Sequence, residues 1–230
     1  MIAQYRPNQR WYLLLRDAEP DAVGALIDAA VQALQQDLLI EVNESDTETL
    51  NTLAARGFSV SRREHLYLVP TDWPRSEAAG FDIISAVDAD PVRWCELDDA
   101  LRRDVPGSMG WHNDPTNFAA DTLRDPQFDP ATYLIAVDQA TGDYAGLVRV
   151  WQRPVGPRLG MIATMPAYRR RGVARALLSQ SFDVLHRAGH TEASCEVDAT
   201  NVASNTLLTG LGARRDGGNV ELERRVAGPQ

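Results

Sequence analysis

The sequence predicts a mixed α/β (α+β-like) fold with a central, mostly antiparallel sheet flanked by helices. Between residues 80 and 226, apolar segments of strand length alternate with segments of helical period, in the order β-α-α-β-β-β-α-β-α-β-β. Residues 1–70 carry the same kind of pattern as the second half of that region. We therefore expect a degenerate β-α-β-α-β half-domain at 1–70, a linker at 71–80 that contains Pro74 and Gly80, and a main domain at 80–226.

Each element of the main domain has a local signal. Asp90 followed by Pro91 is typical of a helix start, because Asp caps the first turn and Pro is tolerated at the first helical position. Gly189 ends the helix that begins at Gly172, and Gly217-Gly218 predicts a turn between two final strands. The expected elements are a strand at 81–87, a helix from 91, a short helix at 118–123, strands at 132–138, 144–152 and 158–165, a helix at 172–188, a strand at 191–197, a helix at 201–211 and two strands on either side of 217–218.

Composition excludes several classes of protein. The formal net charge is −9, which disfavours broad binding to nucleic acid or to anionic lipid. No apolar run approaches the roughly 18 residues of a membrane span, and the N-terminal segment does not have the pattern of a signal peptide. Cys95 and Cys195 give neither a disulfide framework nor metal-ligand spacing, so we expect no metal and a cytoplasmic location.

An internal similarity supports the half-domain. Residues 41–57 align without a gap over residues 196–212, at an offset of 155. At the same offset Asp17 falls opposite Gly172, so the first unit has acid where the second has arginine and glycine. We interpret the first unit as a structural copy without a ligand site. The alternative is that any strand-helix-glycine unit looks similar by chance.

The segment "MPAYRRRGVARALL" concentrates positive charge at a helix entrance in an acidic chain. A helix N-terminus exposes unpaired N–H groups and carries partial positive charge, so cations there are unfavourable unless an anion is present. Gly172 and Ala174 allow close approach of a ligand to the backbone, and the arginines add charged donors. The pattern favours a pyrophosphate site over a solvated basic cluster, which remains the alternative.

The same residues resemble a known family. "IATMPAYRRRGVARALL" is similar to the acetyl-CoA motif Gln/Arg-x-x-Gly-x-Gly/Ala of the GNAT acyltransferase superfamily, here Arg169-x-x-Gly172-x-Ala174. "CEVDATNVASNTLLTGLGA" resembles the family segment N-x-x-A-x-x-L-Y-x-x-L-G-F, which begins here at Asn201. The resemblance covers residues 80–226 and implies the GNAT acyl-CoA N-acyltransferase fold.

The resemblance also implies acetyl-CoA as the cofactor and assigns residues to it. Strand residues would hold the pantetheine arm and polarise the thioester carbonyl, the arginine-glycine turn would hold the pyrophosphate, and Asn201 would contact the cofactor where two central strands splay apart. The residues so implied are Ile162, Ala163, Thr164, Arg169, Arg170, Arg171, Gly172, Val173, Ala174 and Asn201.

The catalytic groups are less well defined. Direct attack of an amine on the thioester needs a proton acceptor, and the resemblance makes Glu196 the candidate. Glu41 holds the same place in the half-domain, so a structural role for Glu196 stays open. The family tyrosine that protonates the leaving thiolate falls on Leu208, so the thiolate leaves unprotonated or His112 supplies the proton.

The loop between the first two helices of the main domain usually shapes the acceptor pocket in this fold. It offers an aromatic wall, a titratable group and a carboxylate for a cationic amine, in the residues Trp111, His112, Asn113 and Asp114. An ordinary surface loop with a buried tryptophan is the alternative.

The expected function is transfer of an acetyl group from acetyl-CoA to a primary amine of a small molecule or peptide N-terminus. The alternative is a catalytically weak acyl-CoA-binding regulatory or interaction module, which Leu208 favours. A homodimer is left open.

Overall fold

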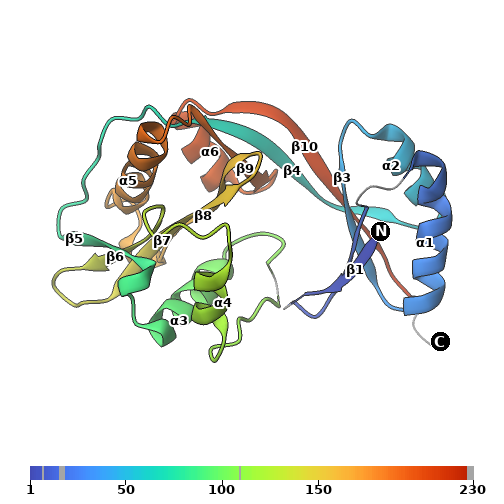
Figure 1. Cartoon of the computed structure of the whole chain (residues 1–230), viewed down its shortest axis with the longest axis horizontal. Coiled ribbons are helices and arrows are strands. Elements are labelled where there is room, and N and C mark those ends of the chain that lie inside the picture. The colour runs from blue at the N-terminus through green and yellow to red at the C-terminus, as the bar shows by residue number, and fades with distance from the viewer. Residues whose placement is uncertain (7, 16–18, 109, 227–230) are drawn as a thin grey trace.

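The computed structural model describes residues 1–6, 8–15, 19–108 and 110–226, which form two lobes joined by two long strands (Figure 1). The elements are β1 (Ile2–Tyr5), β2 (Trp11–Leu14), α1 (Pro20–Leu34), β3 (Leu38–Asn43), α2 (Thr47–Ala54), β4 (Ser59–Pro70), β5 (Phe81–Ser85), η1 (Ala86–Asp88), α3 (Pro91–Arg102), α4 (Phe118–Arg124), β6 (Tyr133–Asp138), β7 (Tyr144–Arg153), β8 (Gly156–Thr164), η2 (Pro166–Tyr168), α5 (Val173–Arg187), β9 (Glu192–Asp198), α6 (Val202–Gly210) and β10 (Arg214–Arg224).

All ten described strands belong to one sheet, in the order β1-β2-β3-β10-β4-β9-β8-β7-β6-β5. The pairs β2–β3 and β8–β9 are parallel, and the other described pairs are antiparallel. The mixed, mostly antiparallel sheet flanked by helices agrees with the fold class predicted from the sequence.

The two lobes exchange strands. The N-terminal lobe contains the unit β2-α1-β3-α2-β4 and the C-terminal lobe contains β8-α5-β9-α6-β10, each with its first two strands parallel. In each unit the last strand leaves its own parallel pair. β4 lies beside β9 of the C-terminal lobe, and β10 lies beside β3 of the N-terminal lobe. β4 and β10 also pair with each other and form the bridge between the lobes in Figure 1.

Local geometry repeats at the offset of 155 that the sequence shows. The Asp46 side chain caps α2 and the Asn201 side chain caps α6, and each accepts a hydrogen bond from the backbone N–H three residues further on, at 3.0 and 3.1 Å. Gly57 and Gly212, which follow these helices, have left-handed φ values of 80° and 78°. The two units therefore share elements, caps and helix ends.

Most expected elements are present, with two differences. The turn predicted at Gly217-Gly218 is wrong: β10 is one strand with a register irregularity between Arg215 and Gly218. Pairing with β4 continues on both sides of the glycines, so the left-handed Gly217 (φ 99°) makes a local bulge instead of a chain reversal. The N-terminal unit is also preceded by an additional strand, β1, which pairs with β2.

The division of the chain at residues 71–80 stays a prediction, because the sheet runs through both parts. Asp17, the residue aligned with Gly172, lies outside the described residues.

Helices cover the two faces of the sheet unequally. α5 packs on β6, β7 and β8, and its Leu178 and Phe182 are completely buried, which stabilises the fold by about 2–3 kcal/mol each. α1 and α2 cover the corresponding face of the N-terminal lobe, where Ile27 and Leu53 are completely buried. α3 packs on the opposite face of the C-terminal lobe, and Trp94 of α3 donates a hydrogen bond to the Tyr133 hydroxyl.

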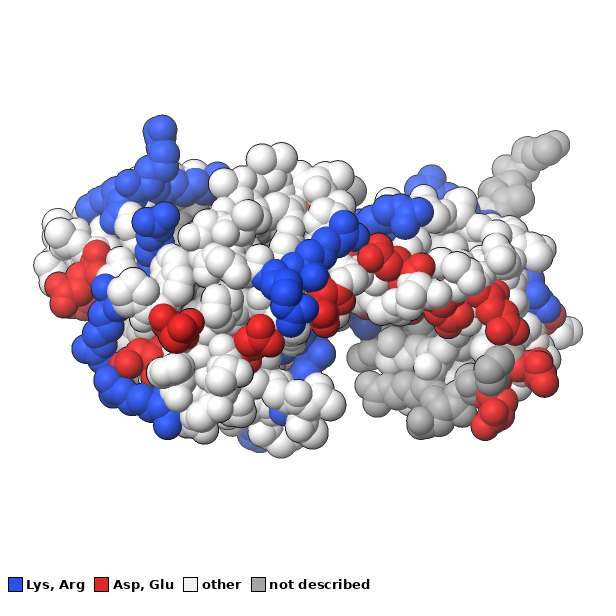
Figure 2. Space-filling model, turned by 90° about the horizontal axis from the view of Figure 1, so that it is seen from above, with Lys and Arg blue, Asp and Glu red and all other residues white. Residues whose placement is uncertain are grey.

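Within the described part of the chain, no helix is long and apolar enough to cross a membrane, and no group of three His, Cys, Asp or Glu side chains is arranged to hold a metal ion. On the face shown in Figure 2, basic and acidic side chains lie next to one another instead of forming a single continuous basic surface.

Candidate active site

The arginine-rich turn connects β8 to α5 and has a backbone suited to anions. Arg170 and Gly172 have left-handed φ values of 61° and 83°, and Gly172 is the N-cap of α5. No side chain caps the first turn of this helix, so its N–H groups remain available. The positive end of the helix dipole lies at the same place.

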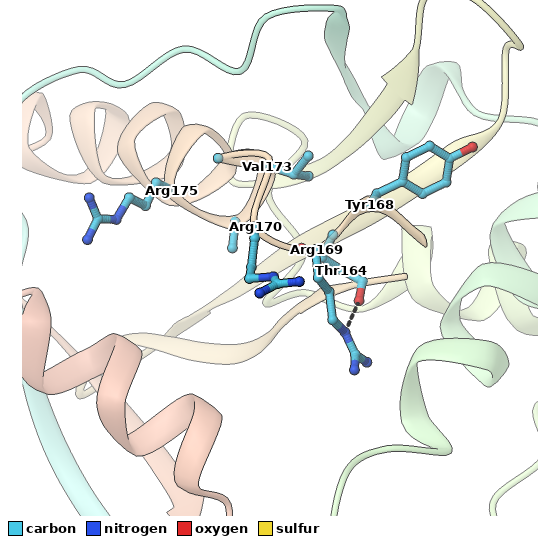
Figure 3. Close-up of a pocket in the computed structure, with 8 residues that line it drawn as sticks. Thr164, Tyr168, Arg169, Arg170, Val173 and Arg175 are labelled. Atoms are coloured by element: carbon cyan, nitrogen blue, oxygen red, sulfur yellow. Dashed lines mark hydrogen bonds between the residues drawn. The ribbon is translucent and has the colours of Figure 1, made fainter. Parts of the chain in front are cut away.

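A cavity of about 430 Å³ lies in front of this turn (Figure 3). Arg169, Arg170 and Arg175 are among its lining residues, and Figure 3 shows the side chains of Arg169 and Arg170 pointing to the same side of the turn. The lining residues are Thr164, Tyr168, Arg169, Arg170, Gly172, Val173, Ala174 and Arg175. This combination of helix N-terminus and three arginines can bind a polyphosphate.

Arg171 is directed elsewhere. Its guanidinium pairs with Asp138 at 3.4 Å and lies 4.4 Å from the ring centre of Phe81. Asp138 is buried at the end of β6, so Arg171 attaches the turn to the sheet. Among the three consecutive arginines, Arg169 and Arg170 line the cavity and Arg171 does not.

β8 and β9 separate beyond their start. Across this parallel pair only Arg158 and Ser194 are in register, and further along the two strands diverge. β8 also has an irregularity in its pairing with β7, where Gly160 falls. A second cavity of about 250 Å³ opens at this splay, lined by Leu101, Asp104, Val105, Ile162, Ala163, Thr164, Arg169, Ala174, Asn201, Ala203, Ser204 and Leu207. It shares Thr164, Arg169 and Ala174 with the first cavity, so the two adjoin.

Arg169 lies where these two cavities meet. Its Nε donates a hydrogen bond to the Thr164 carbonyl at 3.1 Å, and its Nη2 forms an ion pair with Asp104. The hydroxyl of Thr164 is buried without a hydrogen-bond partner among the described residues. A buried polar atom of this kind is costly unless a ligand or water satisfies it.

A third cavity of about 100 Å³ adjoins the second and shares Val105, Ile162, Asn201 and Ser204 with it. Charged side chains from β4 and β9 line it. Glu196 of β9 accepts hydrogen bonds from Arg158 of β8, and Glu64 of β4 pairs with Arg62. The lining residues are Arg62, Glu64, Val105, Pro106, Leu159, Gly160, Met161, Ile162, Cys195, Glu196, Val197, Asp198, Asn201, Ser204 and Leu208.

Asn201 lines both the second and the third cavity, but its side-chain oxygen already caps α6. Leu208, one turn after Ser204, is buried and also lines the third cavity. An alkyl side chain therefore occupies the position where the family resemblance expects a proton donor.

The four residues expected to bind the acceptor are not at these cavities. Trp111, Asn113 and Asp114 line a separate surface cavity of about 540 Å³ beside α4. The His112 side chain is 79% exposed, and its Nδ1 lies 3.9 Å from Asp99. In the same loop it is Val105 and Pro106 that reach the third cavity.

Asn113 explains the position of the loop. Its side-chain amide donates hydrogen bonds to Asp98 at 2.8 Å and to Asp99 at 2.7 Å, both on α3. Asp98 is fully buried and also bonded to Arg102 and Arg149. Burial would raise the pKa of Asp98, but the two arginines outweigh it and lower that pKa.

The polar cavity residues that sequence reasoning missed include Arg62, Glu64, Asp104, Arg175, Asp198 and Ser204. Arg175 lies in the first turn of a helix already recognised from the sequence, so helical spacing could have identified it. Arg62 and Glu64 reach the site through the exchange of β4, for which the sequence carries no local signal.

Comparison with known proteins identifies the class of protein that this fold and site define. Residues 94–213 match the model of the acetyltransferase (GNAT) family, and the chain belongs to that family. No curated protein matches the chain significantly in sequence.

Solved structures share the fold. A GCN5-related N-acetyltransferase from Sphaerobacter thermophilus has a TM-score of 0.77 and 18% identity, over 99% of this chain and 76% of its own. A tandem GNAT protein from the clavulanic acid biosynthesis pathway has a TM-score of 0.71 and 16% identity, over 98% of this chain and 77% of its own. A GCN5-related N-acetyltransferase from Kribbella flavida has a TM-score of 0.63 and 15% identity, over 95% of this chain and 82% of its own.

Proposed function

We propose that the protein is an N-acetyltransferase that moves the acetyl group of acetyl-CoA to a primary amine. The observation that carries the proposal is that three cavities adjoin, from the arginine turn, through the splay of β8 and β9, to a space lined by carboxylates. A long, anionic acyl carrier fits the first two, and a cationic amine fits the third.

The residues present suit acetyl-CoA. Arg169, Arg170 and Arg175, with the N–H groups of Gly172, Val173 and Ala174, would hold the pyrophosphate. The backbone of Ile162, Ala163 and Thr164 faces the splay, and the unpaired Thr164 hydroxyl offers a further hydrogen bond to the pantetheine arm. Arg171 supports the turn from behind through Asp138. When bound, acetyl-CoA supplies an acetyl thioester whose carbonyl carbon is attacked by the amine.

The chain's own groups then handle the proton. A protonated amine has no free electron pair, so a carboxylate must accept its proton, directly or through water. We assign this role to Glu196, which the ion pair with Arg158 fixes in place at the third cavity. The amine forms the new C–N bond while the C–S bond breaks. Because Leu208 cannot donate a proton, the leaving thiolate would take its proton from solvent or from the hydroxyl of Ser204.

A second function has one observation in its favour. The buried Leu208 replaces the expected proton donor, which suits a catalytically weak module that binds acyl-CoA for regulation or interaction. In either case the proposed division is a half-domain at residues 1–70, a linker at 71–80 and an acetyltransferase domain at 80–226.

Two measurements test the proposal. Acetyl-CoA at millimolar concentration should raise the thermal unfolding temperature, since a ligand at one hundred times its Kd adds about 2.7 kcal/mol. Release of coenzyme A across a panel of primary amines then separates enzyme from binding module. Glu196→Gln should lower kcat strongly and leave the acetyl-CoA stabilisation unchanged. No stabilisation would refute the cofactor assignment, and an unchanged kcat would remove Glu196 from the mechanism.

A further inference from the structure

The third cavity is one end of a larger charged surface on the sheet. Side chains alternate along each strand, and the register places Glu41 opposite Glu221, Glu221 opposite Arg62, and Glu64 opposite Asp198. These residues therefore share the face that Glu196 occupies, opposite the face covered by α1, α2, α5 and α6. We call the group Glu41, Arg62, Glu64, Glu196, Asp198 and Glu221 the carboxylate face.

Carboxylates outnumber arginines on this face, and one arginine is shared among several carboxylates. Arg62 contacts Glu64, lies 3.1 Å from Glu221 and lies 3.9 Å from Asp198. Arg158 forms an ion pair with Glu196. Cationic partners are thus fewer than the carboxylates they must neutralise.

Glu41 is the carboxylate of this face whose negative charge is least neutralised by a nearby cation. Its hydrogen-bond partner is the neutral side-chain amide of Asn219, at 3.0 Å. Although Glu41 reaches solvent, the surrounding sheet desolvates its carboxyl, and this effect, together with the charges of Glu64, Glu196 and Glu221, raises its pKa to about 7 in spite of Arg62. The part of this shift that comes from Glu64, Glu196 and Glu221 reflects the negative charge gathered on this face.

The same two causes, burial first and then neighbouring carboxylates, raise the pKa of Glu64 against the opposing effect of Arg62. At the edge of the face, burial and the charge of Arg158 lower the pKa of Arg153, while Glu196 and Glu41 oppose that change. Carboxylates therefore outnumber the arginines that pair with them at and beside the third cavity.

We propose that the acceptor is an amine with a second positive charge, a diamine or polyamine, whose distal ammonium is bound by Glu64 and Glu41 of the carboxylate face; both oxygens of the neighbouring Glu221 are already engaged, by Arg62 and by the Ser61 hydroxyl. The inference rests on the proposed function, because it places the reacting amine at the third cavity beside Glu196. Glu41 and Glu64 come from the N-terminal unit, so that unit supplies part of the acceptor site. An ammonium group donates three hydrogen bonds, which suits several carboxylate oxygens at once.

A series of four-carbon acceptors that differ at one end tests the proposal. With acetyl-CoA, kcat/KM is measured for 1,4-diaminobutane, 4-amino-1-butanol and 4-aminobutanoate. We expect the diamine to exceed the amino alcohol by on the order of tenfold, as for a charge-assisted hydrogen bond, and the amino acid to be the poorest. Equal values for the diamine and the amino alcohol would overturn the proposal.

Variants locate the effect. Glu64→Gln and, separately, Glu41→Gln should reduce the ratio of kcat/KM for the diamine to kcat/KM for 4-amino-1-butanol several-fold. Glu48→Gln is the matched control, because Glu48 is exposed on α2 of the same lobe and away from the carboxylate face. A preference that survives both changes on the carboxylate face would place the distal charge elsewhere.

Calorimetry separates this inference from the proposed function. If no amine is acetylated, binding of 1,4-diaminobutane and of 4-amino-1-butanol is measured directly in the presence of coenzyme A. Tighter binding of the diamine, lost in Glu64→Gln, would support the diamine site while the proposed catalysis fails. Absence of a binding preference would refute the diamine site.

Discussion

Gly172 allows the anion site to be tested apart from the fold. It is the N-cap of α5 with φ 83°, a conformation that costs a residue with a Cβ about 1–2 kcal/mol. A Cβ at this position would lie 3.9 Å from the Glu77 carbonyl oxygen and 4.0 Å from the Ala78 Cβ, which are ordinary contacts. Gly172→Ala therefore introduces backbone strain but no close contact within the protein.

The expected magnitudes follow from that strain. For a chain of this size, 1 kcal/mol corresponds to about 2–4 °C in the unfolding temperature, so Gly172→Ala should lower it by about 2–8 °C. Acetyl-CoA at one hundred times its Kd should raise it by about 5–11 °C. Gly172→Asp has the same strain, partly offset because a carboxylate at a helix N-terminus is favourable, but it places negative charge where the pyrophosphate would bind.

Differential scanning fluorimetry of the wild type and both variants, over a range of acetyl-CoA concentrations, makes the comparison. We expect the alanine variant to lose part of the ligand-induced shift, because its Cβ lies where the ligand approaches the backbone, and the aspartate variant to lose all of it, although without ligand the aspartate variant is at least as stable as the alanine variant. Equal shifts in the two variants would refute the assignment of this turn to a phosphate ligand.

Three further outcomes follow from other parts of the molecule. Asp98→Asn leaves two buried arginines without their shared carboxylate and should cost about 3–5 kcal/mol in urea unfolding; a cost below 1 kcal/mol would contradict this. The pKa of Glu41 is about 7 in the folded state against 4.5 ordinarily, so between these pH values the folded state holds a proton that the unfolded state has lost. The free energy of unfolding therefore falls as pH rises through that window. Glu41→Gln should be more stable than wild type at pH 8 and not at pH 5, as urea unfolding at the two pH values would show. Residues 76–230 alone should not unfold cooperatively, whereas co-expressed fragments 1–75 and 76–230 should assemble, as size-exclusion chromatography and urea unfolding would show.

The sequence predicts local structure well where the signal is local. The Asp90 cap and Pro91 fix the start of α3, and the Asp90 side chain accepts hydrogen bonds from the N–H groups of Val92 and Arg93. Glycine alone is a weaker signal. The pair Gly217-Gly218 is equally compatible with a turn and with a bulge, and pairing of the strand with β3 and β4 on either side selects the bulge.

The candidate site divides in the same way. The arginine turn is identified because the anion-binding features lie within one short segment, from Arg169 to Arg175. The acceptor end is assembled from β4, β8, β9 and the loop after α3, and no local pattern reports such an assembly. The prediction of Trp111 to Asp114 rested on the usual place of this loop in the family's fold and on its composition, and the hydrogen bond from Asn113 to the buried Asp98 holds this part of the loop at a different cavity.

Strand exchange also gives a physical reason why the main domain needs the N-terminal unit. Without β4, β9 would lose the partners of all its residues from Glu192 to Asp198, and the exposed edge would invite aggregation. β10 would lose β3 and β4 together. The strand that covers this edge carries Glu64 into the third cavity, so the contact that completes the sheet also sets the charge of the acceptor end. The N-terminal unit can thus lack a ligand site of its own and still be under selection for both stability and specificity, because one strand serves both.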